Sequence, residues 1–341
     1  MEGSPPWRPR ALLSCIDQRY IDRLLPAPAV RTWALRLLVA AALLVFAYQC
    51  ISVGRRLDWP AFVLALGRPG NWRYLLLAVA MMPLNWLLEA RKWQLLLHAF
   101  LPWSFGKVVR ATLAGVSLSA ATPNRIGEIG GRLLLARRGE YTGVVASSLL
   151  GSACQWVAFL LLAWPALVVT VGGVVQGPWQ VLGGWLLPLG PLLVVVLAVG
   201  GRPLILRLLR WIEGRFHRPT AELRASLVNV KYTLMLRSSA YACLRFSVYC
   251  VQLYLLLWFF GLELPWWTGL AGIAAIYLVQ AGIPLPPGLN FVTRTELGLL
   301  LWQVDAADGV AVLAAYTALF SVNVLLPALP GYWLIVRKNR S

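Results

Sequence analysis

Charged side chains are scarce in this sequence, and histidine is nearly absent. Of 341 residues, 13% are charged, whereas a soluble globular chain carries about 25%. The two histidines, His98 and His217, are far apart, which argues against a metal site built from imidazoles. The five cysteines form no Cys-x-x-Cys pair and lie mostly in apolar runs, as small apolar helix residues do. We therefore expect no metal and no other cofactor.

The sequence contains long apolar blocks instead. Hydrophobic residues make up 59% of the chain, and a run of about 20 of them matches the ~30 Å hydrocarbon core of a bilayer. The blocks predict an all-α polytopic membrane protein with about six spanning helices, at 33–53, 73–97, 141–171, 179–200, 238–260 and 309–336. No small-x-small pattern follows the first block, so we do not interpret it as a cleavable signal peptide.

The basic residues predict the orientation in the membrane. With a cytoplasmic N-terminus, 24 Lys and Arg residues fall on the cytoplasmic side and five outside, as expected because cytoplasmic loops collect positive charge. The chain is then a multi-pass protein of the cell (inner) membrane with both termini in the cytoplasm. Its expected parts are an amphipathic cytoplasmic segment 1–32, a single transmembrane domain 33–336, a basic cytoplasmic loop 201–237 and a cytoplasmic tail 337–341.

The basic loop 201–237 has its own pattern. Apolar residues recur in it at helical spacing, at Leu204, Leu208, Ile212 and Phe216. We interpret this stretch as a helix lying on the inner leaflet, with its arginines on anionic headgroups. Because the leaflet accounts for the net charge of +18, we expect no nucleic-acid partner.

Two regions, 111–138 and 266–304, are predicted to enter the membrane and return as re-entrant helical hairpins. The apolar run Ala111–Thr122 would cover only about 18 Å as a helix, which is too short to cross. A single crossing at 266–304 would leave the basic C-terminus outside, so a hairpin entering from the outside is favoured. Each hairpin stands between two spans, and the second unit is the first turned upside down. We therefore expect an inverted repeat whose broken helices meet near the midplane.

The first hairpin contains a polar break, "ATPNRIGEIGGR". Pro123 lacks an N–H and disfavours a helical Thr122, which places the hairpin tip here. A helix that starts near Arg125 offers unpaired N–H groups and a positive charge to an anion. Glu128 can hold that arginine or receive a cation. The predicted substrate-binding residues of this break are Thr122, Pro123, Asn124, Arg125, Gly127, Glu128 and Arg132.

The second hairpin has a comparable break, "GIPLPPGLNFVTRTE". Its prolines stop a helix at membrane depth, and an Arg and a Glu follow at the start of another helix. Ionisable residues inside a membrane are rare and usually functional. The predicted binding residues here are Pro287, Gly288, Arg294 and Glu296. The alternative is that both breaks lie at the interface and only cap helices.

Several polar residues lie inside the predicted spans. Arg245 is about 10 Å along its span; it either snorkels to the cytoplasmic surface or faces the cavity as another anion contact. Glu89, Arg91 and Lys92 form either an interfacial charge cluster or part of the cavity mouth. Single polar residues are expected to make interhelical hydrogen bonds. These are Asn85, Gln155, Gln252, Gln280 and Asn323.

Both breaks resemble the signatures of a known family. "TPNRIGE" resembles the Thr-Pro-Gly-Arg-x-Gly-Glu signature of the lysylphosphatidylglycerol synthase transmembrane region, a flippase-like integral membrane protein family, with Asn124 where Gly is usual. "PPG…TRTE" resembles its Pro-Gly-Gly-x-Gly-x-Arg-Glu signature, with Leu289-Asn290-Phe291 after Gly288 and Thr295 between Arg294 and Glu296. The resemblance covers roughly 33–336. It implies movement of a lipid or lipid-linked headgroup between leaflets.

In larger members of that family a soluble aminoacyl-transferase domain follows the membrane part. This chain stops at Ser341, so we expect no such synthase activity.

We therefore expect a lipid transporter with a central polar cavity, whose partners are membrane lipids with an anionic or lipid-linked headgroup. One alternative is a non-catalytic partner subunit of a membrane synthase or transferase, in which the polar breaks only pack helices. Another is a membrane transferase acting on lipid headgroups or polyprenyl sugars, with Glu128 or Glu296 as base. The lack of an Asp-x-Asp or Asp-Asp-x-x-Asp motif and of a sizeable soluble domain argues against an enzyme.

Overall fold

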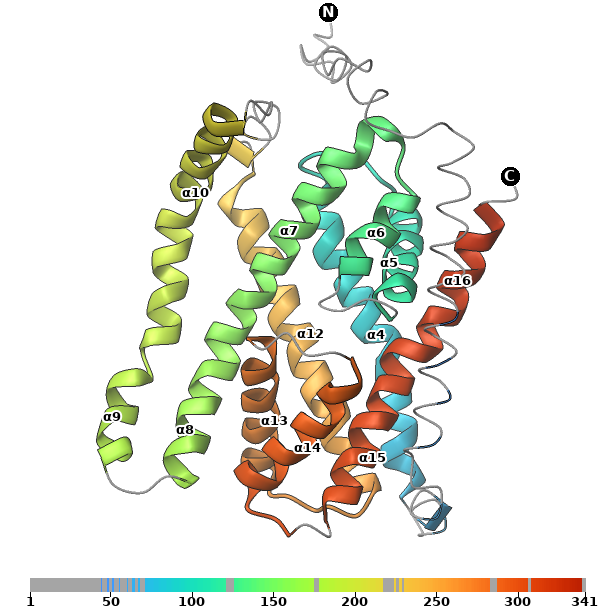
Figure 1. The fold of residues 1–341 in the computed structure, drawn as a ribbon, viewed down its shortest axis with the longest axis vertical. Coiled ribbons are helices and arrows are strands. Elements are labelled where there is room, and N and C mark those ends of the chain that lie inside the picture. Colours follow the sequence, from blue (N-terminus) through green and yellow to red (C-terminus); the bar gives the residue numbers. More distant parts are fainter. Residues whose placement is uncertain are drawn as a thin grey trace, which may run out of the picture.

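The described part of the protein is entirely helical in its regular structure. The computed structural model describes residues 71–120, 126–174, 178–216, 230–282, 287–305 and 308–338, with scattered positions in 44–67 and 224–228. Every regular element in these ranges is a helix (Figure 1), which confirms the all-α prediction. The predicted N-terminal segment 1–32 and most of the span 33–53 lie outside the described residues, as do tail residues 339–341.

The first half of the chain forms a long helix, a helical hairpin and a second long helix. The hairpin consists of α5 and α6, and the second long helix contains a π-helical turn, η3, between α7 and α8. The bounds are α4 Trp72–Leu97, α5 Phe105–Ala120, α6 Ile126–Leu134, α7 Tyr141–Ala158, η3 Phe159–Ala163 and α8 Trp164–Val174. A short helical turn, η2 (Arg138–Glu140), joins the hairpin to α7.

The second half repeats this order. A long helix is followed by the hairpin of α13 and α14 and by a long helix with a π-helical turn, η5, between α15 and α16. The bounds are α12 Tyr232–Phe259, α13 Trp266–Ala281, α14 Pro287–Trp302, α15 Gly309–Phe320, η5 Ser321–Leu325 and α16 Leu326–Lys338. Two further helices, α9 (Pro178–Leu186) and α10 (Leu189–Phe216), connect the halves.

Corresponding elements of the two halves are separated by a nearly constant number of residues. The starts of α4 and α12 are 160 residues apart, those of α5 and α13 are 161 apart, those of α6 and α14 are 161 apart, and those of η3 and η5 are 162 apart. A proline follows each π-helical turn after one residue, at Pro165 and Pro327. In Figure 1 the first hairpin lies in the upper half of the molecule and the second in the lower half.

Apolar packing around α12 forms the main core. Leu253, Leu256 and Leu257 of α12 are fully buried together with Ile273 of α13 and Leu319 of α15. Lipid tails are as apolar as leucine, so association of such helices depends on close packing and on hydrogen bonds between them. Gln252 Nε2 of α12 donates to the Ala78 carbonyl oxygen of α4 over 2.8 Å, which ties these two long helices together.

Close backbone contact positions the first hairpin. A methyl group on Gly131 of α6 would overlap the Ala114 carbonyl of α5, and one on Gly331 of α16 would overlap Leu113 and Ser117. Ser117 Oγ also donates to the Ala328 carbonyl oxygen at 2.9 Å. The two helices of the first hairpin therefore pack closely on each other, and α5 packs closely on α16, through contacts that only small residues allow.

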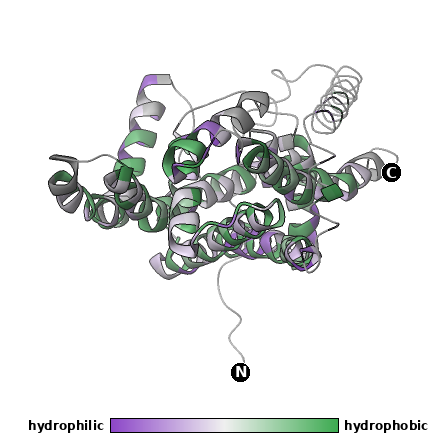
Figure 2. Cartoon of the chain, turned by 90° about the horizontal axis from the view of Figure 1, so that it is seen from below, coloured by the Kyte–Doolittle hydropathy of each residue, from purple (hydrophilic) through white to green (hydrophobic). Residues whose placement is uncertain are grey.

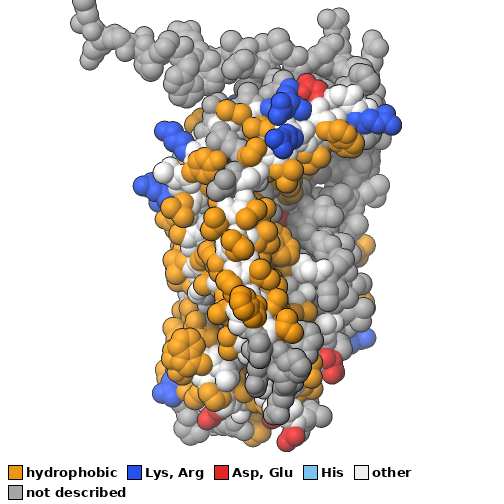
Figure 3. Space-filling model, turned by 90° about the vertical axis from the view of Figure 1, so that its left-hand side faces the viewer, with side chains coloured by type: hydrophobic (Ala, Val, Ile, Leu, Met, Phe, Trp, Pro, Cys, Tyr) orange, Lys and Arg blue, Asp and Glu red, His pale blue; other side chains and the backbone are white. Residues whose placement is uncertain are grey.

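The flanks of the bundle are apolar. Large hydrophobic side chains are exposed along α10, including Leu192, Val195, Val196 and Leu204. Figure 3 shows that hydrophobic side chains cover the middle of the side that carries α9 and α10, while Lys and Arg gather toward the two ends. Seen along the long axis, the helices are mainly apolar or neutral in hydropathy, with short hydrophilic stretches (Figure 2). This distribution is typical of a protein surrounded by lipid.

Three described helical stretches are long and apolar enough to cross a membrane: Tyr141–Val174, Tyr232–Phe259 and Gly309–Leu334. A fourth is reached if the bent pair Leu182–Ala198 and Pro203–Arg215 counts as one span. The predicted span 73–97 corresponds to α4, which is 26 residues long but carries Glu89, Arg91 and Lys92 and so falls short in apolar character. The number six stays a prediction.

The basic region predicted as loop 201–237 is partly a continuation of the preceding helix. Residues 201–216 belong to α10, and the axis turns by 60° between Leu182–Ala198 and Pro203–Arg215. Pro203 explains a bend here because it removes one helical hydrogen bond and clashes with the preceding turn. Leu204 and Leu208 are exposed on this segment, and its position on the inner leaflet stays a prediction.

We predict that Gly331→Ala destabilises the protein by about 1–3 kcal/mol, because overpacking of a close helix contact forces the backbones apart. Gly172→Ala is the matched control, since nothing lies within 4 Å of a methyl group at that position and alanine favours a helix. Thermal unfolding in detergent, followed by tryptophan fluorescence, measures both. Equal melting temperatures for the two variants would contradict the close contact between α16 and α5.

Candidate functional site

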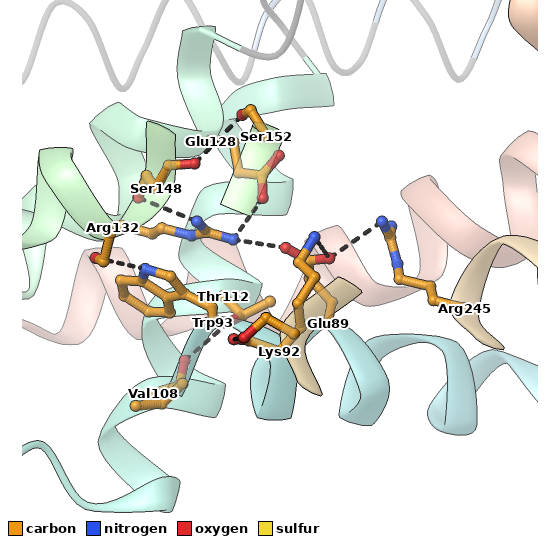
Figure 4. A network of polar contacts seen from close by, with 12 residues as sticks. Glu89, Lys92, Trp93, Val108, Thr112, Glu128, Arg132, Ser148, Ser152 and Arg245 are labelled. Atoms are coloured by element: carbon orange, nitrogen blue, oxygen red, sulfur yellow. Dashed lines mark hydrogen bonds and ion pairs between the residues drawn. The ribbon is translucent and has the colours of Figure 1, made fainter. Parts of the chain in front are cut away.

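A buried carboxylate on α4 is the centre of the main polar cluster (Figure 4). Glu89 is 3% exposed and contacts three cations: Lys92 at 2.6 Å, Arg132 at 3.0 Å and Arg245 at 3.1 Å. Lys92 lies one turn further along α4, Arg132 comes from α6 and Arg245 from α12. We call these four residues and Glu128 the Glu89 cluster. It joins the first hairpin to the long helices α4 and α12.

Arg132 is the most fully engaged cation of the cluster. Its Nη2 donates to Glu89 at 3.0 Å and to Glu128 at 2.5 Å, and its Nη1 donates to Ser148 Oγ of α7 at 3.1 Å. The guanidinium also lies 4.2 Å from the centre of the Trp93 ring. Trp93 is itself held by a 2.9 Å hydrogen bond from its indole N–H to Ser147 Oγ. These contacts fix the arginine in one orientation.

The Glu89 cluster carries an excess positive charge. Lys92, Arg132 and Arg245 oppose the carboxylates of Glu89 and Glu128, which leaves one positive charge uncompensated within the cluster. Four of its side chains are at most 6% exposed, whereas that of Glu128 is 18% exposed. Buried charges persist only when they are paired and hydrogen-bonded. The cluster is therefore a rigid, net-positive centre with its accessible edge at Glu128.

A chain of buried amides lies beside this cluster. Asn85 Nδ2 donates to Asn323 Oδ1 at 2.9 Å, and Asn323 Nδ2 donates to Gln252 Oε1 at 3.1 Å. The Asn323 carbonyl oxygen lies in the π-helical turn η5 and accepts a 3.1 Å hydrogen bond from the Trp86 indole. The predicted interhelical hydrogen bonds of Asn85, Gln252 and Asn323 are thus confirmed.

A second polar cluster lies in the other half of the chain. Arg294 of α14 donates through Nε to Gln280 Oε1 of α13. Its guanidinium carbon is 5.1 Å from the ring centre of Tyr277 (α13) and 5.4 Å from that of Tyr316 (α15). We call these four residues the Arg294 cluster. Glu296 does not join it, because this side chain is exposed.

The structure brings together only some of the predicted binding residues. Glu128, Arg132 and Arg245 meet in the Glu89 cluster, and Gly127 is buried at the start of α6. Arg294 has its own contacts with Gln280, Tyr277 and Tyr316, none of which belongs to the Glu89 cluster. Pro287 and Gly288 begin α14. Thr122, Pro123, Asn124 and Arg125 lie outside the described residues.

Glu89 and Lys92 lie deeper than the sequence pattern predicts. The pattern indicates an interfacial cluster or a cavity mouth, yet both residues are 3% exposed. The signal was their spacing: opposite charges three residues apart, inside a helix that continues through the apolar residues 95–97. Arg91 does face outward, where it contacts Gln94 at 2.8 Å. The snorkelling interpretation of Arg245 is wrong, because this residue is 5% exposed and pairs with Glu89.

A third, more peripheral group of contacts surrounds Glu140 in η2. Trp103 donates to Glu140 at 3.0 Å, Lys107 contacts it at 3.2 Å, and the Arg137 backbone N–H donates at 2.8 Å. Burial raises the pKa of Glu140, but the hydrogen bonds from Arg137, Trp103 and Lys107 outweigh it, so this pKa lies below its usual value. This group fastens the loop after α4 to the start of α7.

We predict that Glu89→Gln destabilises the protein by about 3–5 kcal/mol, because three cations would then surround a neutral amide in a buried site. Adding Lys92→Met should recover part of the loss by removing one of those charges. Glu296→Gln is the matched control. This carboxylate is exposed, so the substitution should leave the melting temperature unchanged. Thermal unfolding in detergent measures all three. A Glu89→Gln protein as stable as its control would show that the carboxylate is not needed.

We also predict a pH dependence from Glu140. A depressed pKa in the folded state stabilises the protein at neutral pH, and this contribution is lost as pH falls through that pKa. The melting temperature of Glu140→Gln should lie below that of the wild type at pH 7, and the difference should shrink below about pH 4. Comparing the two proteins across pH isolates this carboxyl from the others. A difference that stays constant with pH would rule out the contribution.

The chain matches a known family of membrane proteins. The model of the family described as "Lysylphosphatidylglycerol synthase TM region" matches residues 33–319. A search of curated proteins finds no match. The family match spans both hairpins and the Glu89 and Arg294 clusters, and it agrees with the apolar helices in indicating a multi-pass, lipid-related integral membrane protein. The chain therefore belongs to the lysylphosphatidylglycerol synthase TM region family.

Proposed function

We propose that this protein moves a lipid or lipid-linked headgroup between the two leaflets of the membrane. The observation that carries the proposal is the Glu89 cluster: a net-positive group of buried charges inside an apolar helical bundle of a lipid-related family. Charged residues at membrane depth are expensive and usually mark a substrate path. An anionic headgroup is the cargo that such a centre can attract.

The arrangement of the hairpins supports the route. The nearly constant spacing of about 161 residues between the halves and the hairpins in opposite halves of the molecule (Figure 1) fit an inverted repeat of the kind found in secondary transporters. We propose that each hairpin is re-entrant, the first from the cytoplasmic side and the second from outside. Small movements of one half against the other would then open the headgroup path to each leaflet in turn, while the acyl chains stay in lipid.

Glu128 is proposed to lie at the entrance to the Glu89 cluster. It is the most exposed member, and it shares Arg132 with Glu89. An arriving anion can displace Glu128 from Arg132 without exposing the guanidinium, because Glu89, Ser148 and Trp93 still hold it. Arg132 would therefore exchange the Glu128 carboxylate for the anionic headgroup at little electrostatic cost.

A second candidate is a non-catalytic subunit of a membrane synthase or transferase. The favouring observation is that the carboxylate of Glu89 already has three cationic partners, as expected if the cluster only locks helices together. In that case the protein would not support lipid exchange alone. The same assay decides between the two candidates.

We predict that Arg125→Ala and Glu128→Ala each reduce lipid exchange by tenfold or more in proteoliposomes, while the protein stays folded. A tenfold loss corresponds to about 1.4 kcal/mol, within the range of a lost charge-assisted hydrogen bond. Exchange is measured with fluorescent phospholipids and a membrane-impermeant quencher. Glu263→Ala is the control, because this carboxylate is exposed between α12 and α13.

If vesicles that contain the wild-type protein exchange lipid no faster than protein-free vesicles, transport is refuted and the subunit is favoured. Unchanged exchange in both variants would remove the first hairpin from the path. New lipid species in the vesicles, detected by mass spectrometry, would instead indicate a transferase.

A further inference from the structure

The two halves place an arginine at corresponding positions. Arg132 and Arg294 are 162 residues apart, which matches the spacing of 161 between α6 and α14 and of 162 between the π-helical turns. Both arginines come from the second helix of a hairpin. Any difference between their surroundings therefore reflects a difference in side chains on a shared framework.

The carboxylate that neutralises Arg132 is missing in the second half. Glu89 of α4 corresponds to Tyr249 of α12, because the starts of those helices are 160 residues apart. Within the described part of the chain, Arg294 has no ion pair; its contacts are the Gln280 amide and two tyrosine rings. Glu296, two residues along, is exposed. The second half thus keeps the cation and lacks its anion.

The neighbours of Arg294 supply unused hydrogen-bond donors. Tyr277 is 7% exposed and Tyr316 is fully buried, and within the described residues neither hydroxyl has a hydrogen-bond partner. A buried hydroxyl without a partner costs about 1–3 kcal/mol. Two such hydroxyls on the rings that face one guanidinium need an explanation. The guanidinium itself has five N–H donors and bonds to one neutral oxygen, that of Gln280.

The geometry points to an oxyanion subsite formed by Arg294, Tyr277 and Tyr316, which binds the phosphate of an anionic phospholipid. Arginine and tyrosine hydroxyls are donors suited to a phosphate, and arginine matches its geometry with paired N–H bonds. The Glu89 cluster already contains two carboxylates, so the Arg294 cluster is the stronger site for an anion. This inference rests on the proposed function, since it adds a second anion site, at the second hairpin, to the headgroup path that passes the Glu89 cluster.

The tyrosine hydroxyls provide a test that leaves the fold intact. Tyr277→Phe combined with Tyr316→Phe keeps both rings against Arg294 and removes only hydroxyls that have no partner, so the variant should be as stable as the wild type without ligand. Tyr249→Phe is the matched control, because its ring contacts Tyr277 at 5.3 Å but lies outside the Arg294 cluster. Arg294→Gln removes the cation.

Binding of dioleoylphosphatidylglycerol to the detergent-purified protein is measured by native mass spectrometry, with dioleoylglycerol as the comparator that lacks a phosphate. We expect the double phenylalanine variant and Arg294→Gln each to weaken binding of the phospholipid by about tenfold. Tyr249→Phe should leave it unchanged, and binding of dioleoylglycerol should not respond to any of the variants. Unchanged phospholipid binding in both test variants would overturn the subsite.

Inorganic phosphate is the second arm. If phosphate stabilises the wild type through Arg294 and the two hydroxyls while the phospholipid does not depend on them, the lipid assignment is wrong. Lipid exchange in proteoliposomes separates this inference from the proposed function. Exchange that is insensitive to the variants refutes the subsite and leaves transport standing. Binding that depends on the variants in a protein without exchange activity refutes transport and leaves the subsite.

Discussion

The burial of Glu89 among three cations joins the first hairpin to one long helix from each half of the protein. A carboxylate on α4 cannot lie inside an apolar bundle alone, because removing a charge from water costs several kcal/mol unless partners replace the solvent. Arg132 of α6 and Arg245 of α12 supply those partners at 3.0 and 3.1 Å. One side chain thereby joins three elements that are far apart in the sequence. The hairpin, the two long helices and the proposed headgroup path all depend on this electrostatic centre.

Close helix packing makes the centre possible. Gly131 lets α6, which carries Arg132, lie directly on α5, and Gly331 lets α16 pack against Leu113 and Ser117 of α5. In a lipid environment such contacts, together with the hydrogen bonds of Asn85, Asn323 and Gln252, contribute what the hydrophobic effect contributes in water. The small residues therefore allow the close packing that keeps water away from the buried charges and holds them in place.

The two halves have the same order of helices but differ in the chemistry of their polar clusters. In the first, an arginine on the hairpin is neutralised by carboxylates from α4 and α6. In the second, the corresponding arginine lies between tyrosine rings and bonds to an amide. A fully paired arginine holds structure together, whereas an arginine with neutral neighbours retains its attraction for an anion. This asymmetry is what a protein that handles a charged headgroup can exploit, since two anion sites of different strength would then lie along its path.

The features that depend on local pattern and composition could be predicted from the sequence alone. Long apolar runs predicted the helices, the polar breaks predicted both hairpins, and the motif around Glu128 indicated the family. The i,i+4 spacing also placed Arg132 beside Glu128. The fold was needed to show which distant charges meet. Glu89 is the common partner of Arg132 and Arg245, and Arg294 lies among tyrosines, apart from that group. Hydropathy records how costly a charge is inside a membrane, but the partner that offsets the cost comes from another helix, and its position is fixed by packing rather than by local sequence.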